Sequence, residues 1–258
     1  MIAETPVEKF AAALDRCAED ALWEAGVDQP PVDAFTLAQR LGIEVAGDSN
    51  LRGRARFLRP RPLRRSETPR AAILLGPEPR RERRHWAVAH EVGESIAQRV
   101  FDLVGLHPSE APALSRERVA NALAGRLLAP KRWLRGVHRD AEGDLTQIKQ
   151  TFVTASHELL VRRLLEVIEA PIVVTLYDQN QLVWRRWNRP GSPPPCSPEE
   201  TNCQRAAHQD AQTMTAAVGF SDDGPFGIPG MGIRCWPVHE PAWKREITIS
   251  ELAECEWI

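Results

Sequence analysis

A helical segment that carries one histidine and two glutamates constrains this chain more than any other feature. Residues 80–101, RRERRHWAVAHEVGESIAQRVF, repeat apolar side chains at the spacing of one helix face and predict a helix of about five turns. His90, Glu91 and Glu94 fall near its middle. Because positions four residues apart share a face, His90 and Glu94 are expected to point the same way, with Glu91 beside them.

Imidazole and carboxylate groups at this spacing can hold a metal ion. A zinc helix reads H-E-x-x-H, in which the histidines bind the ion and the glutamate activates the metal-bound water. Here Glu94 takes the place of the last histidine. This geometry makes His90 and Glu94 candidate metal ligands and Glu91 a candidate general base. A histidine and two acids on an amphipathic helix are ordinarily a solvated face, and the motif alone does not exclude that alternative.

A third ligand is expected from a neighbouring helix, because zinc hydrolases use three protein ligands and one open position. The candidate is Glu117, in the segment ERVAN. Asn121 lies one turn further on, where its amide can orient a ligand by a hydrogen bond. His107 and His138, in predicted loops near these helices, are alternative ligands, although a lone histidine is more often structural.

The remaining pattern predicts an α+β fold. Helices are expected at residues 7–26, 34–42 and 115–130, with three short strands between residues 43 and 76. Residues 144–169 indicate a helix, a short turn near residues 153–154 and a second helix, and IVVTLYDQNQLVWRRW indicates a hairpin that turns at DQNQ. The expected domains are a mostly helical one with a small sheet at 1–130, a helical unit at 131–170, and a β-containing domain at 171–258. The predicted helix caps are Asp33, Ser115, Asp144 and Thr154.

Four ordered segments resemble the ImmA/IrrE family of metallopeptidases. They are PPVDAFTLAQRLGIEV, AVAHEVGE, ERVANALAGRLLAP and DLTQIKQTFVTASHELLVRRLLEV. The family's corresponding patterns are P-V-D-x-x-x-I-A-x-x-L-G-I-x-V, F-x-x-AHELGH, E-x-x-AN-x-FA-x-x-LLMP and L-A-x-x-F-x-VS-x-x-A-L-x-x-R-L. The resemblance covers roughly residues 10 to 170 and departs from the family at Glu94, where the family has histidine.

The resemblance implies a zincin-like domain followed by a helix-turn-helix-like unit. It also implies zinc bound by His90, Glu94 and Glu117, with Glu91 as the base. Members of the family typically cleave a partner helix-turn-helix repressor. With two glutamate ligands the zinc site is formally neutral, activates water less, and suits harder metals such as Mn or Fe better than an imidazole-rich site does. The expected function is a metal-dependent, peptidase-like regulator. The alternative is a catalytically degenerate relative that binds a partner or senses a signal.

Charge and composition limit the other classes of function. The net charge of −2 and the apolar second helix, ASHELLVRRLLEV, argue against specific DNA binding, although residues 52–84 hold twelve arginines. The start of the chain has no apolar signal region, and no apolar run is long enough to span a membrane. Five dispersed cysteines are typical of reduced thiols in a cytoplasmic protein. Cys196 and Cys203 could instead form a disulfide that closes a loop, or help to bind a metal, but their spacing matches no common zinc motif.

Overall fold

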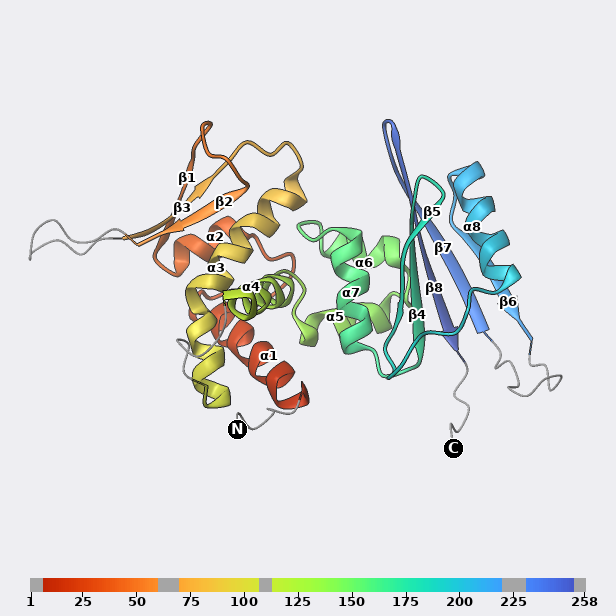
Figure 1. Cartoon of the computed structure of the whole chain (residues 1–258), viewed down its shortest axis with the longest axis horizontal. Helices are drawn as coiled ribbons and strands as arrows, with labels where there is room; N and C mark the ends of the chain where they lie inside the picture. Colours follow the sequence, from red (N-terminus) through yellow and green to blue (C-terminus); the bar gives the residue numbers. More distant parts are fainter. Residues whose placement is uncertain (1–6, 60–69, 107–112, 220–230, 253–258) are drawn as a thin grey trace, which may run out of the picture. The chain divides into compact units, whose positions relative to one another are not determined.

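The computed structural model describes residues 7–59, 70–106, 113–219 and 231–252. The chain forms two compact units, Met1–Arg163 and Leu164–Ile258. The first unit is mostly helical with a small sheet, and the second is built on a larger sheet (Figure 1). The predicted α+β fold is therefore confirmed. The predicted domain boundaries at residues 130 and 170 stay predictions.

The described part of the first unit contains six helices and the start of a seventh. They are α1 (Val7–Glu24), α2 (Ala34–Arg40), α3 (Arg81–Val104), α4 (Ala113–Leu128), α5 (Lys131–Asp140), α6 (Leu145–Thr151) and α7 (His157–Val167). Helices α3 and α4 pack closely against each other, and α1 contacts both of them. The helix that carries His90 is thus a central element of this unit.

Two of the four predicted helix caps are confirmed. The Asp33 carboxylate accepts a hydrogen bond from the backbone N–H of Thr36, and Asp144 caps α6 in the same way. The prediction for Ser115 is wrong, because α4 begins at Ala113 and includes Ser115 in its first turn. The prediction for Thr154 is also wrong. Its hydroxyl donates to the carbonyl of Val32, and the Ser156 hydroxyl accepts the first-turn amide of α7 instead.

The three predicted strands form one mixed sheet. Strand β3 (Ala71–Leu75) lies in the middle, parallel to β1 (Ile43–Gly47) and antiparallel to β2 (Ala55–Leu58). Helix α3 packs against β2 and β3. Among the described residues, β2 therefore forms the edge of the sheet beside the helix that carries His90.

Gly93 allows α3 and α4 to approach each other. A Cβ atom at this position would lie 2.8 Å from the carbonyl oxygen of Ala120 and 3.1 Å from Cβ of Leu123. Both distances are shorter than ordinary van der Waals contact, so a larger residue would push the helices apart. The glycine inside the HEVGE motif therefore sets the spacing between His90 and the residues of α4.

Ion pairs hold the charged residues of the helix-turn-helix-like segment. Arg163 of α7 is 2% exposed and lies 3.2 Å from the carboxylate of Asp15, which also pairs with Arg126 at 3.0 Å. Arg162 pairs with Glu158 one turn away. The two arginines of this helix thus bind carboxylates within the chain.

In its described residues, the second unit holds a five-stranded antiparallel sheet and helix α8, and it begins with the end of α7. Its elements are β4 (Ile172–Asp178), β5 (Gln181–Trp187), α8 (Pro198–Asp210), β6 (Met214–Val218), β7 (Met231–Glu240) and β8 (Trp243–Leu252), in the sheet order β5-β4-β8-β7-β6. The predicted hairpin is confirmed: Gln179 and Asn180 both have positive φ at its turn. Such a pair matches the twist of antiparallel strands.

Helix α8 covers one face of this sheet, and the sequence reading missed it. The Ser197 hydroxyl and the Glu200 carboxylate form a reciprocal capping box, and Pro198 occupies the first turn. Below the helix, Cys203 and Ala207 join a small apolar core with Met231, Ile233 and Cys235.

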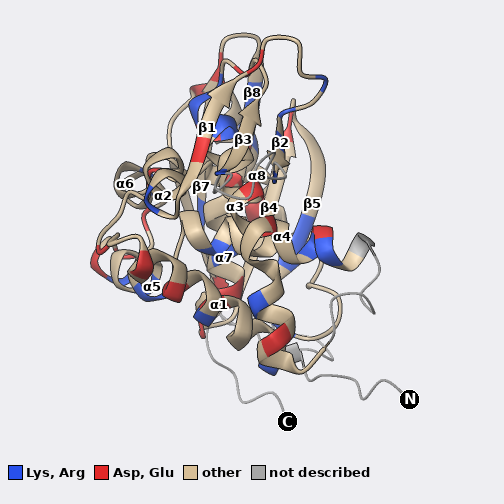
Figure 2. Ribbon diagram, turned by 90° about the vertical axis from the view of Figure 1, so that its left-hand side faces the viewer, with Lys and Arg blue, Asp and Glu red and all other residues tan. Residues whose placement is uncertain are grey.

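Charged residues of both signs are mixed along the ribbon, for example on α5 (Figure 2). No helix among the described residues is long and apolar enough to cross a membrane.

Candidate functional site

The structure brings the three charged residues of the α3 motif together. His90, Glu91 and Glu94 each offer one ligand atom, and these atoms lie within 4.8 Å of one another. The helix itself produces this grouping, since i and i+4 side chains lie one above the other. His90 is partly buried, Glu91 is buried and Glu94 is exposed. The cluster therefore reaches from the interior to the surface.

Helix α4 contributes Glu117 and Asn121 to the same place. The Nε2 atom of His90 lies 3.6 Å from Oε1 of Glu117, and Nδ1 lies 3.2 Å from Oδ1 of Asn121. The Asn121 amide in turn donates to Oε1 of Glu117 at 3.1 Å. If Nδ1–H donates to Asn121, Nε2 carries the lone pair that faces Glu117. This tautomer is the one a metal ligand needs.

Glu91 is the buried acid of the cluster, with 7% of its surface exposed. Burial raises the pKa of its carboxyl above the ordinary value, and the charges of Glu94 and Glu117 raise it further, although His90 and the backbone N–H of Phe57 oppose the shift. A carboxylate with raised proton affinity is a better proton acceptor near neutral pH. The contact with Phe57 also places edge strand β2 beside this group.

A cavity of about 600 Å³ adjoins the cluster. Its walls include Glu94 of α3, Glu117 of α4 and Phe57 of β2, together with the cationic side chains of Arg59 and Arg116. A space of this size accommodates several amino-acid side chains. The exposed carboxylates of the cluster thus face a hollow with both acidic and basic walls.

Neither His85 nor His138 joins this cluster. His85 is buried, and its Nδ1 accepts a hydrogen bond from the backbone N–H of Ala34 at 3.3 Å, so it is a structural group at the start of α2. His138 belongs to neither metal-type cluster among the described residues. His107 lies outside the described residues.

The cysteines carry neither a clip nor a metal site in the described part of the chain. Cys17, Cys196, Cys203 and Cys235 are free thiols. Cys203 is buried in the core beneath α8, whereas Cys196 is exposed and contacts the hydroxyl of Tyr177. Among the described residues, Cys196 and Cys203 therefore form neither a disulfide nor part of a metal-type cluster.

A second cluster of metal-ligand type lies in the second unit. It consists of His208, His239 and Glu246, whose ligand atoms also lie within 4.8 Å of one another. The sequence reading found no ligand motif in this region. The three residues are far apart along the chain, and only the register of β7 with β8 and the position of α8 bring them together.

Comparison with solved structures shows a similar fold. A Mycobacterium tuberculosis transcriptional regulator matches with a TM-score of 0.59 and 18% sequence identity, over 93% of this chain and 87% of that one. At this identity the likeness establishes a shared fold alone. No protein-family model matches the chain, and no curated protein matches it either.

Proposed function

We propose that this chain is a peptidase-like regulator that holds a divalent metal through His90, Glu94 and Glu117. Its expected partner is a helix-turn-helix transcriptional repressor. The orientation of His90 carries the proposal: Asn121 binds one ring nitrogen and leaves the other facing Glu117. The resemblance to the ImmA/IrrE family supports the peptidase-like part. The likeness in fold to a transcriptional regulator supports the regulatory part.

The donor set at this site fits a metal ion. One imidazole and two carboxylates are ligands that zinc, manganese and iron all accept, and Asn121 provides the hydrogen bond that fixes the ring of His90. When bound, the ion would polarise a carbonyl and lower the pKa of water. Because two of the three proposed ligands are anionic, we expect weaker water activation with zinc than in a site with two histidines.

The chain's own residues supply the rest of the proposed chemistry. Glu91 is buried beside His90 and has a raised pKa, so it is the group that would take a proton from the attacking water. Edge strand β2 and the neighbouring cavity offer a place for an extended segment of the partner. Asn121 would hold the imidazole of His90 in place, and its own amide is held by the hydrogen bond to Glu117.

The alternative function is a module that binds a partner or senses a signal without cleaving anything. The exposed Glu94, in the position where the family has histidine, favours this alternative because the added negative charge reduces electrophilic activation. Duplex DNA is not the proposed partner in either case, since Arg162 and Arg163 are paired with carboxylates.

Cleavage by matched variants tests the proposal. The full-length protein, loaded with Zn²⁺ or with Mn²⁺, is incubated with purified helix-turn-helix repressors, and new chain termini are identified by mass spectrometry. We expect Glu91→Gln to abolish cleavage and to keep its metal, because Glu91 moves a proton and does not hold the ion. Cleavage by Glu91→Gln at the wild-type rate would remove Glu91 from its role. Metal binding without cleavage of any repressor would favour the alternative.

A further inference from the structure

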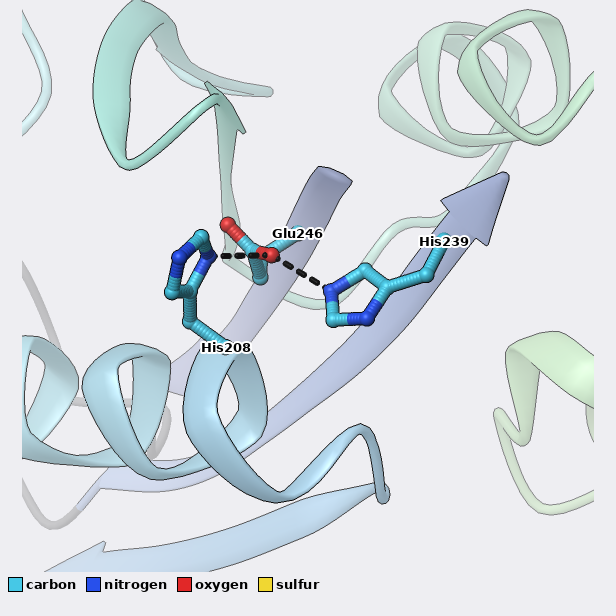
Figure 3. Close-up of side chains that lie close together, drawn as sticks. All are labelled: His208, His239 and Glu246. Atoms are coloured by element: carbon cyan, nitrogen blue, oxygen red, sulfur yellow. Dashed lines mark hydrogen bonds and ion pairs between the residues drawn. The ribbon is translucent and has the colours of Figure 1, made fainter. Parts of the chain in front are cut away.

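We propose that His208, His239 and Glu246 form a second metal site, which takes a divalent transition-metal ion of the zinc type. The Glu246 carboxylate lies between the two imidazoles, which come from a helix and from a strand (Figure 3). All three residues belong to the second unit. The proposal uses none of the residues at the α3 site and stands independently of the function proposed for that site.

Two imidazole nitrogens lie close to one carboxylate oxygen. Nδ1 of His208 lies 2.9 Å from Oε1 of Glu246, and Nε2 of His239 lies 2.7 Å from the same oxygen. In a tetrahedral zinc site, ligand atoms at about 2.0–2.1 Å from the ion lie roughly 3.3 Å apart. Each of the two pairs therefore needs to open by roughly half an ångström to admit an ion.

The sheet register explains why these residues meet. Glu246 of β8 pairs with Pro237 of β7, and His239 is two residues further along β7. Residues two apart in a strand share a face, so His239 and Glu246 are diagonal neighbours. That face is the one that α8 covers, and His208 reaches it from the last turn of the helix. Three separate elements thus supply one ligand each.

The environment of Glu246 distinguishes it from Glu200, a buried glutamate in the first turn of α8. Glu200 is 2% exposed, and a permanent cation neutralises it: Arg185 binds both its carboxylate oxygens at 3.0 and 2.9 Å. Glu246 is fully buried, and its ion-pair partners among the described residues are the two imidazoles. Imidazole is a common metal ligand, so the compensating charge at Glu246 can come from a bound cation.

Gln204 binds one oxygen of the Glu246 carboxylate, which leaves the other oxygen to coordinate an ion. Its amide nitrogen lies 3.2 Å from Oε2 of Glu246 and 3.0 Å from Oδ1 of Asn180. This contact holds Oε2 and leaves Oε1 for the ion, as outer hydrogen bonds do in metal sites. Lys244, which pairs with His239 across the hairpin, donates its ammonium to the carbonyl of His208.

Access and donor type indicate which ion would bind. The side chains of His208 and His239 are 24% and 16% exposed, so water can reach the site and fill a fourth position. Two nitrogens and one oxygen suit Zn²⁺ and its neighbours in the first transition row, whereas Mg²⁺ and Ca²⁺ prefer oxygen ligands throughout. A bound ion would link α8 to β7 and β8.

Calorimetric titration of the full chain with ZnCl₂ tests the proposal, in a His90→Ala background that removes the predicted ligand at α3. We expect one equivalent of Zn²⁺ to bind and to raise the melting temperature. Adding His239→Ala or Glu246→Gln should weaken binding by more than about 100-fold, and Gln204→Ala by about 10- to 100-fold. Arg234→Gln is the control: Arg234 lies on the same strand as His239, but it pairs with Glu251 of β8 and stacks over Trp236 without contacting the three ligands, so this variant should bind as its parent does.

Two results would overturn the proposal. One is that the His90→Ala protein binds no Zn²⁺, and the other is that Glu246→Gln binds it as tightly as its parent. Glu246→Gln keeps the shape of the side chain, so it decides the matter if His239→Ala does not fold. If the wild type binds Zn²⁺ and the His90→Ala protein does not, the ion is held at the α3 site, which supports the function proposed there. Each proposal can therefore fail while the other stands.

Discussion

His90 and Asn121 are joined by a hydrogen bond between two helices, with Nδ1 of the imidazole 3.2 Å from the amide oxygen. This bond selects which ring nitrogen faces Glu117 and would remain available to an ion. We therefore expect Asn121→Ala to lower the affinity of the α3 site for Zn²⁺ by about 10- to 100-fold, measured by competition with a chromogenic chelator. Asn121→Asp keeps an acceptor for His90 and should recover part of the loss. Equal affinity in the wild type and in Asn121→Ala would show that this bond does not prepare a ligand.

Gly93 is predicted to be required for the packing of α3 on α4. Gly93→Ala places a methyl group 2.8 Å from the carbonyl of Ala120, so the helices must separate. We expect a loss of about 1–3 kcal/mol in the free energy of unfolding, measured by urea denaturation. Gly136→Ala is the matched control, because it lies in α5 with nothing within 4 Å of the new Cβ. The control should be neutral or stabilising by up to about 1 kcal/mol. Similar effects of the two substitutions would contradict the packing argument.

His85 is expected to make stability depend on pH. Burial lowers its pKa below the ordinary 6.5, and nearby Arg81 and Arg84 act in the same direction, while Asp33 opposes them. As the pH falls, His85 is protonated near pH 6.5 in the unfolded chain but only at a lower pH in the folded chain. The free energy of unfolding therefore decreases as the pH drops from 6.5 towards the folded pKa. The limiting slope is about 1.4 kcal/mol per pH unit.

Urea denaturation at pH 7.5 and at pH 5.5 measures this effect. The wild type should lose more stability between the two values than His85→Gln, which cannot take up the proton. The comparison between the two proteins removes the contribution of the other histidines. An identical loss in both would show that His85 does not cause the dependence.

Glu94 is the residue at which the α3 motif departs from H-E-x-x-H. Replacing it by histidine removes one negative charge and supplies an imidazole at the position that the H-E-x-x-H motif requires. We expect Glu94→His to raise Zn²⁺ affinity by at least about tenfold, a gain of 1.4 kcal/mol. Glu94→Gln removes the same charge without adding an imidazole and should weaken binding. If Glu94→His binds Zn²⁺ no better than Glu94→Gln, the pocket does not accept the second histidine as a ligand.

The sequence predicts those parts of this protein that depend on neighbours along the chain. The helical period identifies α3, and the strand pattern identifies β1 to β3 and the β4–β5 hairpin, because each is set by local spacing and turn residues. Helix α8 was missed even though Ser197 and Glu200 form a capping box. The proline-rich stretch before it indicates a break in structure, and it masks the start of a helix that begins with proline.

The second cluster could not be predicted because its spacing is not local. His208 and His239 are 31 residues apart, and Glu246 follows on a third element, so no short motif connects them. Their meeting depends on which residue of β7 pairs with which residue of β8, and on where α8 crosses the sheet. By contrast, His90 and Glu94 share a helix face whatever the tertiary fold is.

The central claim is that His90 binds a metal ion, and the most direct measurement is anomalous diffraction from a crystal of the zinc-loaded protein. Data recorded above and below the zinc absorption edge locate the ion without any assumption about activity. The account predicts a peak about 2.0–2.1 Å from Nε2 of His90, with a carboxylate oxygen of Glu94 or Glu117 at a similar distance. A zinc-loaded crystal with no anomalous peak between α3 and α4 would contradict it.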